Sequence, residues 1–282
     1  MHAEIVMIGT ELLLGEIVDT NANKLSIALK DIGLDLYYKT TVGDNEDRIV
    51  DVLNLALDRS DVVITSGGIG PTVDDVTRQA IARATGRDLV YSKVLEAQIA
   101  SRFKSFGRKM ADNNKRQAYM PEGAFPLENP VGTAPCFLSE DVKGRGCVIC
   151  LPGVPRELEH MMEHKITPVL IERMGGIKVT KVRVLRTCAV GESNIDRGVG
   201  DLMTSSNPSV GLAAHAGQTD VRIAAKADTE AEVDELIRPM EETLRERLGV
   251  AIYGVGKETV AEVVGNLLKQ EGLSLGVADT LT

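Results

Sequence analysis

The residues best suited to chemistry form one run, Thr65–Asp75, which reads TSGGIGPTVDD. The run continues the apolar stretch DVVI, which is typical of a buried strand. Gly67, Gly68 and Gly70 would let backbone N–H groups approach an anion closely, and the N-terminus of the following helix would add partial positive charge. The run therefore predicts a phosphate-binding loop at the end of a strand.

Acidic and polar residues also follow the other expected strands, at what should be the same sheet edge. They are Glu11, Asp19, Thr20, Asn21, Asp44, Asn45, Asp74, Asp75 and Glu157. Carboxylates beside a phosphate are unfavourable unless a cation neutralises them, and hard oxygen ligands suit Mg²⁺ or Mn²⁺. The set predicts a divalent cation bridging a phosphorylated ligand. Taken singly, each acid could be a helix cap or a surface group, as could Thr72.

Strands alternate with helices over the first 174 residues. The expected strands are 3–9, 34–42, 61–68 and 147–153, and the expected helices are 25–32, a helix capped by Asp44, 76–86, 92–106 and 155–174. This alternation predicts βαβ units in an α/β fold, with a doubly wound, mostly parallel sheet. In such sheets ligands bind at the carboxyl ends of the strands, which is where the glycine run lies.

A second domain is expected from the Gly175-Gly176 pair to residue 255. We expect strands at 178–188, 209–214, 219–228 and 250–254, with helices at 191–204 and 229–248. That order predicts a small α+β domain. Residues 256–282 contain one amphipathic helix and the apolar stretch LSLGVADTLT, which predicts a strand and the start of a truncated third domain.

Composition restricts the classes of partner. The chain has 282 residues and a net charge of −9, so binding to nucleic acid is disfavoured, because such binding relies on clustered cations. No apolar run is long enough to span a bilayer, which argues against a membrane protein. The start, MHAEIVMIGT, has no basic region and no cleavage site, so a first strand and a cytoplasmic location are expected.

Four cysteines are too few and too scattered to predict a disulfide framework. Cys147 and Cys150 match the C-x-x-C pattern of redox and zinc sites. They lie in the run CVICLPG, however, which is typical of a buried strand whose residues three apart point to opposite faces. Reduced, structural cysteines are therefore the main expectation.

Six separated motifs between residues 5 and 162 resemble the N-terminal domain of the CinA (competence/damage-inducible) family. They are IGTELLLGEIVDTN, TTVGDN, TSGGIGPTVDD, ADNNKRQAYMPEGA, NPVGTAP and LPGVPRELEHM. That domain shares its fold with molybdopterin-binding proteins. Residues 177–253, with RTCAVGESNID, resemble the family's KH-like middle domain. Cys136 stands where the family usually has glycine.

The resemblance implies two activities. One is hydrolysis of the pyrophosphate of ADP-ribose by the N-terminal domain, which needs a divalent metal such as Mg²⁺, Mn²⁺ or Co²⁺. The other is deamidation of nicotinamide mononucleotide by a C-terminal domain, whose family motif is roughly A-E-S-C-T-G-G. Here Asp279–Thr282 replaces E-S-C-T and the glycines are missing, so we expect no deamidation. A homo-oligomer, in the simplest case a dimer, is also expected.

With an ADP-ribose-like nucleotide as the ligand, each candidate residue has an expected role. Backbone groups of Gly67, Gly68 and Gly70 would cradle phosphate. The cation would lie near Asp44, Asp74 and Asp75. Lys115 would supply a further charge to the pyrophosphate, while Asn114 and Glu157 would orient ligand or water. The remaining nucleotide-binding positions are Thr72, Asn21, Asn45 and Gly153.

Other functions fit these residues less well. A pterin- or nucleotide-binding module without turnover stays open, because fold does not fix function and no general base is obvious. A Nudix-type enzyme is rejected, since Arg156-Glu157-Leu158-Glu159 lacks the second acidic pair. His160–His164 matches H-x-x-E-H but has no evident third zinc ligand. RNA binding by the second domain is disfavoured because Gly191–Asn194 lacks the second glycine of a GXXG loop.

Overall fold

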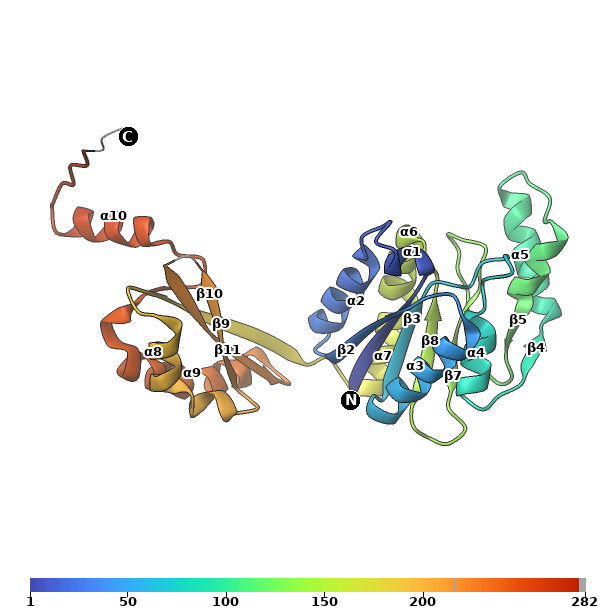
Figure 1. The fold of residues 1–282 in the computed structure, drawn as a ribbon, viewed down its shortest axis with the longest axis horizontal. Helices are drawn as coiled ribbons and strands as arrows, with labels where there is room; N and C mark the ends of the chain where they lie inside the picture. Colours follow the sequence, from blue (N-terminus) through green and yellow to red (C-terminus); the bar gives the residue numbers. More distant parts are fainter. Residues whose placement is uncertain (216, 279–282) are drawn as a thin grey trace. The chain divides into compact units, whose positions relative to one another are not determined.

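The computed structural model describes residues 1–215 and 217–278 and divides the chain into two compact units (Figure 1). The first is Met1–Ile177 and the second begins at Lys178. The sequence places this boundary after residue 174. Residues 256–278, expected to start a third domain, are grouped with the second unit.

The first unit is built on a sheet with the strand order β2-β1-β3-β8-β7-β6. The first four strands in that order are mutually parallel; β7 runs antiparallel to β8, and β6 in turn runs antiparallel to β7. Their bounds are β1 His2–Ile8, β2 Asp35–Val42, β3 Val62–Ser66, β6 Phe125–Leu127, β7 Cys136–Glu140 and β8 Cys147–Leu151. The predicted mostly parallel sheet is confirmed, with the glycine run directly after the central strand β3.

Helices cover both faces of this sheet, as expected for a doubly wound fold (Figure 1). On one face lie α2 (Thr20–Asp31), α6 (Pro155–Met161) and α7 (Thr167–Met174), the last two joined by a π-helical turn at Met162–Ile166. On the other lie α3 (Glu46–Arg59) and α4 (Thr77–Ala84). The shorter elements are α1 Thr10–Leu13, β4 Leu89–Tyr91, α5 Lys93–Ser105, a 3₁₀ helix Asp112–Ala118 and β5 Tyr119–Pro121.

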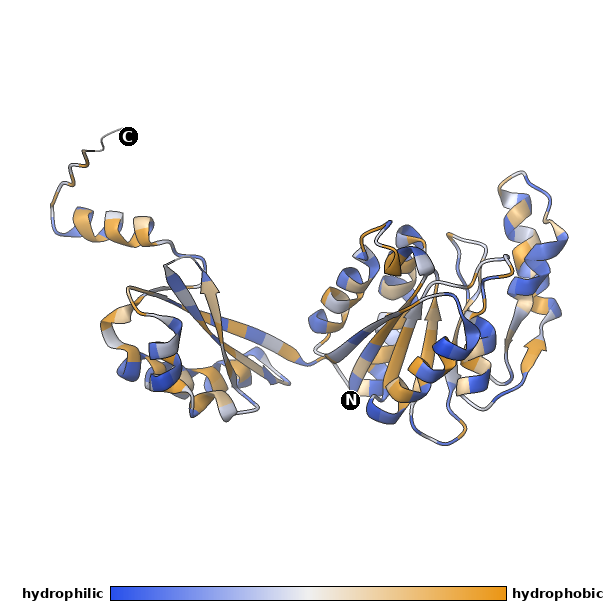
Figure 2. Cartoon of the chain, in the orientation of Figure 1, coloured by the Kyte–Doolittle hydropathy of each residue, from blue (hydrophilic) through white to orange (hydrophobic). Residues whose placement is uncertain are grey.

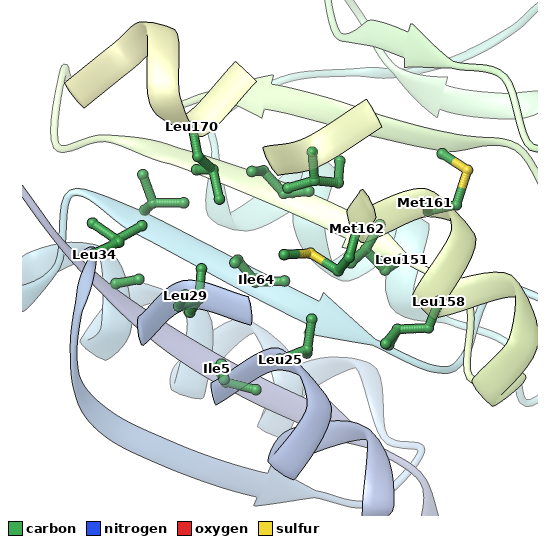
Figure 3. Packing of buried hydrophobic residues seen from close by; sticks show 14 of the residues in the cluster. Ile5, Leu25, Leu29, Leu34, Ile64, Leu151, Leu158, Met161, Met162 and Leu170 are labelled. Atoms are coloured by element: carbon green, nitrogen blue, oxygen red, sulfur yellow. The ribbon is translucent and has the colours of Figure 1, made fainter. Parts of the chain in front are cut away.

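The core follows from the two-residue period of the strands. Ile5 and Met7 of β1 pack into the cluster under α2 and α6, whereas Val6 and Ile8 pack into the cluster under α3 and α4. Figure 3 shows the first cluster, where side chains from the strands meet those of the helices. Figure 2 shows apolar residues concentrated on the central strands, as a sheet buried on both faces requires.

The C-x-x-C pattern fits the same rule. Cys147 packs in one cluster and Cys150 in the other, and both side chains are fully buried. Burial raises the pKa of the Cys147 thiol to about 11 and that of Cys150 to about 12. Both cysteines are free thiols. The expectation of structural cysteines on opposite faces of a strand is confirmed.

Two expectations about local structure are corrected. Asp44 does not cap the helix after β2, because Asn45 is the N-cap and its side chain accepts a hydrogen bond from the Arg48 N–H. The predicted terminal strand is also not formed by residues 273–278, which have no regular secondary structure; residues 279–282 lie outside the described part of the chain. An apolar stretch becomes a strand only where it finds a pairing partner.

The second unit is a small α+β domain, as predicted. Its sheet has the order β10-β11-β9-β12 and is antiparallel. Helix α9 packs on the sheet and begins with a capping box between Thr229 and Glu232. The bounds are β9 Val179–Cys188, α8 Glu192–Val199, β10 Ser209–His215, β11 Gln218–Ala227, α9 Glu230–Leu248, β12 Ile252–Val255 and α10 Val260–Gln270.

Within the residues that the structure describes, no helix has both the length and the apolar character needed to cross a membrane.

Candidate functional site

The loop after β3 requires glycine at its first two positions. Gly67 and Gly68 have positive φ angles of 107° and 65°, where side chains are disfavoured. A Cβ atom on Gly67 would lie 2.1 Å from the carbonyl oxygen of Ile8, and one on Gly68 would lie 2.2 Å from Thr77 Oγ1. The loop therefore passes against β1 and the start of α4 at a distance that only glycine permits.

Asp75 fixes the far end of this loop. Its carboxylate accepts hydrogen bonds from the Gly70 N–H at 2.7 Å, from the Thr72 N–H at 2.8 Å and from the Thr72 hydroxyl. Thr72 also contacts the neighbouring carboxylate, and its hydrogen bond holds the pKa of Asp74 below the usual range. Asp75 therefore acts on the shape of the loop and is not the helix cap that we considered.

Arg78, which was not among the predicted site residues, anchors the loop through two of its carbonyl groups. Its side chain is buried and donates to the carbonyl oxygens of Ile69 at 2.6 Å and Gly70 at 2.7 Å. Burial lowers the pKa of Arg78. The bonds orient the carbonyl groups of the loop toward the protein interior.

Among residues 67–70, two N–H groups have no acceptor within the described part of the chain. Gly67 donates to the carbonyl oxygen of Leu151 and Gly70 donates to Asp75, so neither N–H can cradle a phosphate as predicted. Within the described residues, the N–H groups of Gly68 and Ile69 have no acceptor. Adjacent unpaired N–H groups around a glycine of positive φ form a small anion-binding concavity. Of the three glycines predicted to cradle a phosphate, only Gly68 therefore has an N–H group without an acceptor among the described residues.

A cavity of about 520 Å³ lies over this loop at the carboxyl ends of β1, β3 and β8. It receives nine of the predicted site residues, namely Asn21, Asp44, Gly67, Gly68, Gly70, Asp74, Asp75, Gly153 and Glu157. The topology therefore brings together loops that are far apart in the sequence, as ligand sites of parallel sheets require.

Four predicted residues lie outside the cavity lining. Lys115 is exposed and forms an ion pair with Asp112 at 3.0 Å, so its charge is already neutralised locally. Asn114 is buried in the 3₁₀ helix, where its side chain donates to the carbonyl oxygen of Ala111. Asn45 is occupied as the cap of α3, and the N–H and hydroxyl groups of Thr72 are held by Asp75, as described above.

Glu157 is held in the cavity by Asn129, a second residue that we did not anticipate. Asn129 Nδ2 donates to Glu157 Oε2 at 2.7 Å, while its Oδ1 accepts from the N–H groups of Val131 and Gly132. A Cβ atom on Gly132 would lie 1.8 Å from Glu157 Oε2. The segment NPVGTAP therefore holds this carboxylate in place. Its Asn-Pro pair and its glycine are the sequence features that could have indicated this role.

Asp44 ties the loops after β1 and β2 together. Its Oδ2 accepts from the N–H of Thr10 at 2.7 Å and from the Thr10 hydroxyl at 2.8 Å. The Asp44 N–H in turn donates to Thr10 Oγ1. Thr10 was the third residue that the sequence analysis did not identify.

The charged side chains that line the cavity, among the described residues, are all acidic. Six carboxylates line it: Glu11, Asp19, Asp44, Asp74, Asp75 and Glu157. Among the residues that the structure describes, no Lys, Arg or His lines the same cavity. The positive charge nearest to these carboxylates that the hydrogen bonds show is that of the buried Arg78, which lies against the carbonyl oxygens of Ile69 and Gly70.

The predicted metal trio does not form a cage of its own. Across residues 1–215 and 217–278, no three His, Cys, Asp or Glu side chains lie close enough together to hold a metal ion. The reason is local, because Asp75 is engaged with loop N–H groups and Asp44 with Thr10.

Comparison with known proteins agrees with this architecture. Residues 4–172 match the family model described as a probable molybdopterin binding domain, and residues 182–254 match that of the damage-inducible protein CinA KH domain. The first unit is thus a molybdopterin-binding-type domain and the second is KH-like.

The two matches occur together in one family, and the chain belongs to it: the CinA family. It is 44% identical over its whole length to a competence-damage inducible protein of Symbiobacterium thermophilum and 41% identical to one of Clostridium botulinum. It spans 66% and 68% of the length of these two relatives.

A crystal structure of a CinA protein from Thermoplasma acidophilum, described as of unknown function, is also similar. The sequence identity is 34% and the TM-score is 0.55. The match covers 60% of this chain and 97% of the other.

Proposed function

We propose that the first unit hydrolyses the pyrophosphate of ADP-ribose or of a similar nucleoside diphosphate in the cavity over Gly68. The observation that supports this most strongly is that two unpaired N–H groups at Gly68 and Ile69 lie in a cavity whose charged side chains, among the described residues, are all carboxylates. The N–H groups suit one phosphate, and the carboxylates suit a divalent cation that neutralises it.

Mg²⁺ or a similar ion would be held by Asp74 together with phosphate oxygens and water, because such ions are commonly bound through one or two carboxylates and a substrate phosphate. Asp74 suits this role because it lines the cavity, is exposed and has a lowered pKa, so it is ionised. When bound, the ion supplies charge neutralisation at the phosphoryl group. Asp44 also lines the cavity.

The chain's own residues would supply binding and proton transfer. The N–H groups of Gly68 and Ile69 hold phosphate oxygens in place. Glu157, oriented by Asn129, accepts a proton from the attacking water. Water adds to one phosphorus atom, the bridging P–O bond breaks, and AMP and ribose 5-phosphate leave with the two phosphate groups.

Product analysis tests this proposal. The full chain is incubated with ADP-ribose and Mg²⁺, Mn²⁺ or Co²⁺, with EDTA as the matched control. We expect equal amounts of AMP and ribose 5-phosphate in at least one metal and neither product in EDTA. Nucleotide that binds and is recovered uncleaved under all conditions would contradict the hydrolase.

The second candidate is a pterin- or nucleotide-binding module without turnover. The description of the matched family as a probable molybdopterin binding domain favours it. The same experiment separates the two, since a binding module retains its ligand intact.

A further inference from the structure

Two of the chain's four histidines lie in contact on one helical segment outside the cavity. His160 is in the last turn of α6, and His164 is in the π-helical turn that follows it. Their ring centroids are 4.4 Å apart and the ring planes meet at 70°. Neither residue is part of the cavity lining over Gly68. The proposed function therefore gives this pair no role.

The junction between α6 and the π-helical turn brings the two rings into line. In a regular α-helix, residues four apart are offset by about 40° around the axis. A π-helical turn is wider, because its hydrogen bonds join residues five apart, so four residues across the junction come closer to one full turn. The contact between the rings of His160 and His164 agrees with this alignment.

The backbone that carries the pair is held by the core. Met161, Met162 and Ile166 are at most 4% exposed and belong to the core cluster of Figure 3. By contrast, His160 is partly exposed and the side chain of His164 is 50% exposed. Two rings that a fixed backbone holds together and that solvent can reach are preorganised for binding.

The ring nitrogens of the pair are available to a ligand. In the part of the chain that the structure describes, the only polar contact of these rings joins His164 Nε2 to Glu163 Oε2 at 3.9 Å, which is too long for a hydrogen bond. A neutral imidazole offers one nitrogen lone pair and is the commonest side-chain ligand of metals. Two imidazoles one helical turn apart can chelate one metal ion.

The distance between the rings indicates the geometry of such a chelate. A metal ion bound at ~2.0 Å to a ring nitrogen lies about 3.2 Å from the ring centroid. Two imidazoles in adjacent positions of a square or octahedral ion, about 90° apart, then have centroids about 4.5 Å apart, whereas a tetrahedral pair needs about 5.2 Å. The observed 4.4 Å fits the first arrangement, which is typical of Cu²⁺ and Ni²⁺ and not of Zn²⁺.

We propose that His160 and His164 form a surface site for Cu²⁺ or Ni²⁺, in which water takes the remaining positions. Two protein ligands agree with the finding that no three His, Cys, Asp or Glu side chains among residues 1–215 and 217–278 could hold a metal ion. The exposed carboxylate of Glu163 adds negative charge beside the bound ion. The site is separate from the cation proposed for the cavity.

Calorimetric titration of the full chain with NiCl₂ tests the site, on protein prepared without a polyhistidine tag. We expect the wild type to bind the ion. We expect His160→Gln and His164→Gln each to weaken binding at least about tenfold, because either variant leaves one imidazole and loses the chelate. Electron paramagnetic resonance with CuCl₂ should show one bound ion with two imidazole nitrogens in the wild type and no such ion in either variant.

His2→Gln is the matched control. Its ring already contacts the carbonyl oxygen of Arg59 and the carboxylate of Asp61, and it adjoins the N-terminal amine, so the variant also removes any site there. Ni²⁺ affinity should be unchanged in this variant. His164→Gln keeps the test valid should His160→Gln fail to fold, because the side chain of His164 is half exposed.

The proposal is overturned if the wild type binds neither ion, or if its Ni²⁺ affinity equals that of both variants. A loss in only one of the two variants also overturns it, because a chelate needs both rings. Tighter binding of Zn²⁺ than of Ni²⁺ would contradict the geometry that the ring separation indicates. None of these outcomes depends on whether the protein hydrolyses ADP-ribose.

Discussion

The cavity of the first unit differs in its charges from the sheet of the second unit. In the second unit, the buried Asp220 is paired with Arg186 through two hydrogen bonds of 2.9 Å, and Lys181 is paired with Asp234. In the first unit, six carboxylates line one cavity without a cationic side chain among the described residues. Asp220 therefore has its counter-charge within the chain, whereas the cavity carboxylates have no Lys, Arg or His among the described lining residues.

Thiol labelling should show the largest contrast between the units. Burial raises the pKa values of Cys147 and Cys150 in the first unit to about 11 and 12, whereas Cys188 in the second unit is partly exposed. Because only the thiolate reacts, iodoacetamide at pH 8 should label Cys188 at least ~10²-fold faster than either. Mass spectrometry of time points measures this ratio. Equal rates in the folded protein would mean that the β8 strand is not buried as described.

Asp74→Asn should reduce turnover of ADP-ribose by about 10²-fold, the scale expected for loss of one positioned electrostatic group. Asp74 is exposed, so the thermal midpoint should stay nearly unchanged. Lys115→Ala is the control, because Lys115 is paired with Asp112 outside the cavity. Steady-state assays of both variants test whether Asp74 holds the cation. Full activity in Asp74→Asn would contradict this role.

Arg78→Met should lower the free energy of unfolding by about 2 kcal/mol, because two loop carbonyl groups lose their buried donor. The comparison variant is Arg247→Met in the second unit, whose ion pair with Asp201 is exposed and should contribute less than about 1 kcal/mol. Urea unfolding of both variants gives the difference. A smaller loss for Arg78 than for Arg247 would argue against the buried anchor.

Asp75→Asn should have the smallest effect, a loss of about 1 kcal/mol of stability, since the amide keeps one acceptor for the loop N–H groups. Turnover should fall far less than in Asp74→Asn, because Asp75 supports the loop and Asp74 faces the ligand. Thermal unfolding and assays on the same preparations separate these two roles. If Asp75→Asn lost more activity than Asp74→Asn, Asp75 would be the residue that faces the ligand and Asp74 the one that supports the loop.

Much of the fold was predictable because its signals are local. The apolar period of β1 and β3 and the glycines after Ser66 depend on neighbouring residues alone, and the structure confirms the sheet that they predicted. Which N–H groups of the loop after β3 stay unpaired could not be predicted from the sequence. Whether Gly67 or Gly68 is unpaired depends on Leu151, which approaches only in the folded chain.

The supporting residues of the site were missed for a similar reason. Arg78 and Asn129 act through tertiary contacts with Ile69 and Glu157, and their sequence context resembles that of surface residues. Lys115 shows the opposite case. Its partner Asp112 lies three residues earlier, a spacing typical of local ion pairs, so its neutralisation could have been inferred from the sequence.

The central claim is that the cavity accepts phosphate only together with a cation. Calorimetric titration of inorganic pyrophosphate into the full chain, once with Mg²⁺ and once with EDTA, tests it most directly. We expect binding to be about tenfold tighter with Mg²⁺, since the six carboxylates otherwise repel the anion. Equal affinity in EDTA would contradict it.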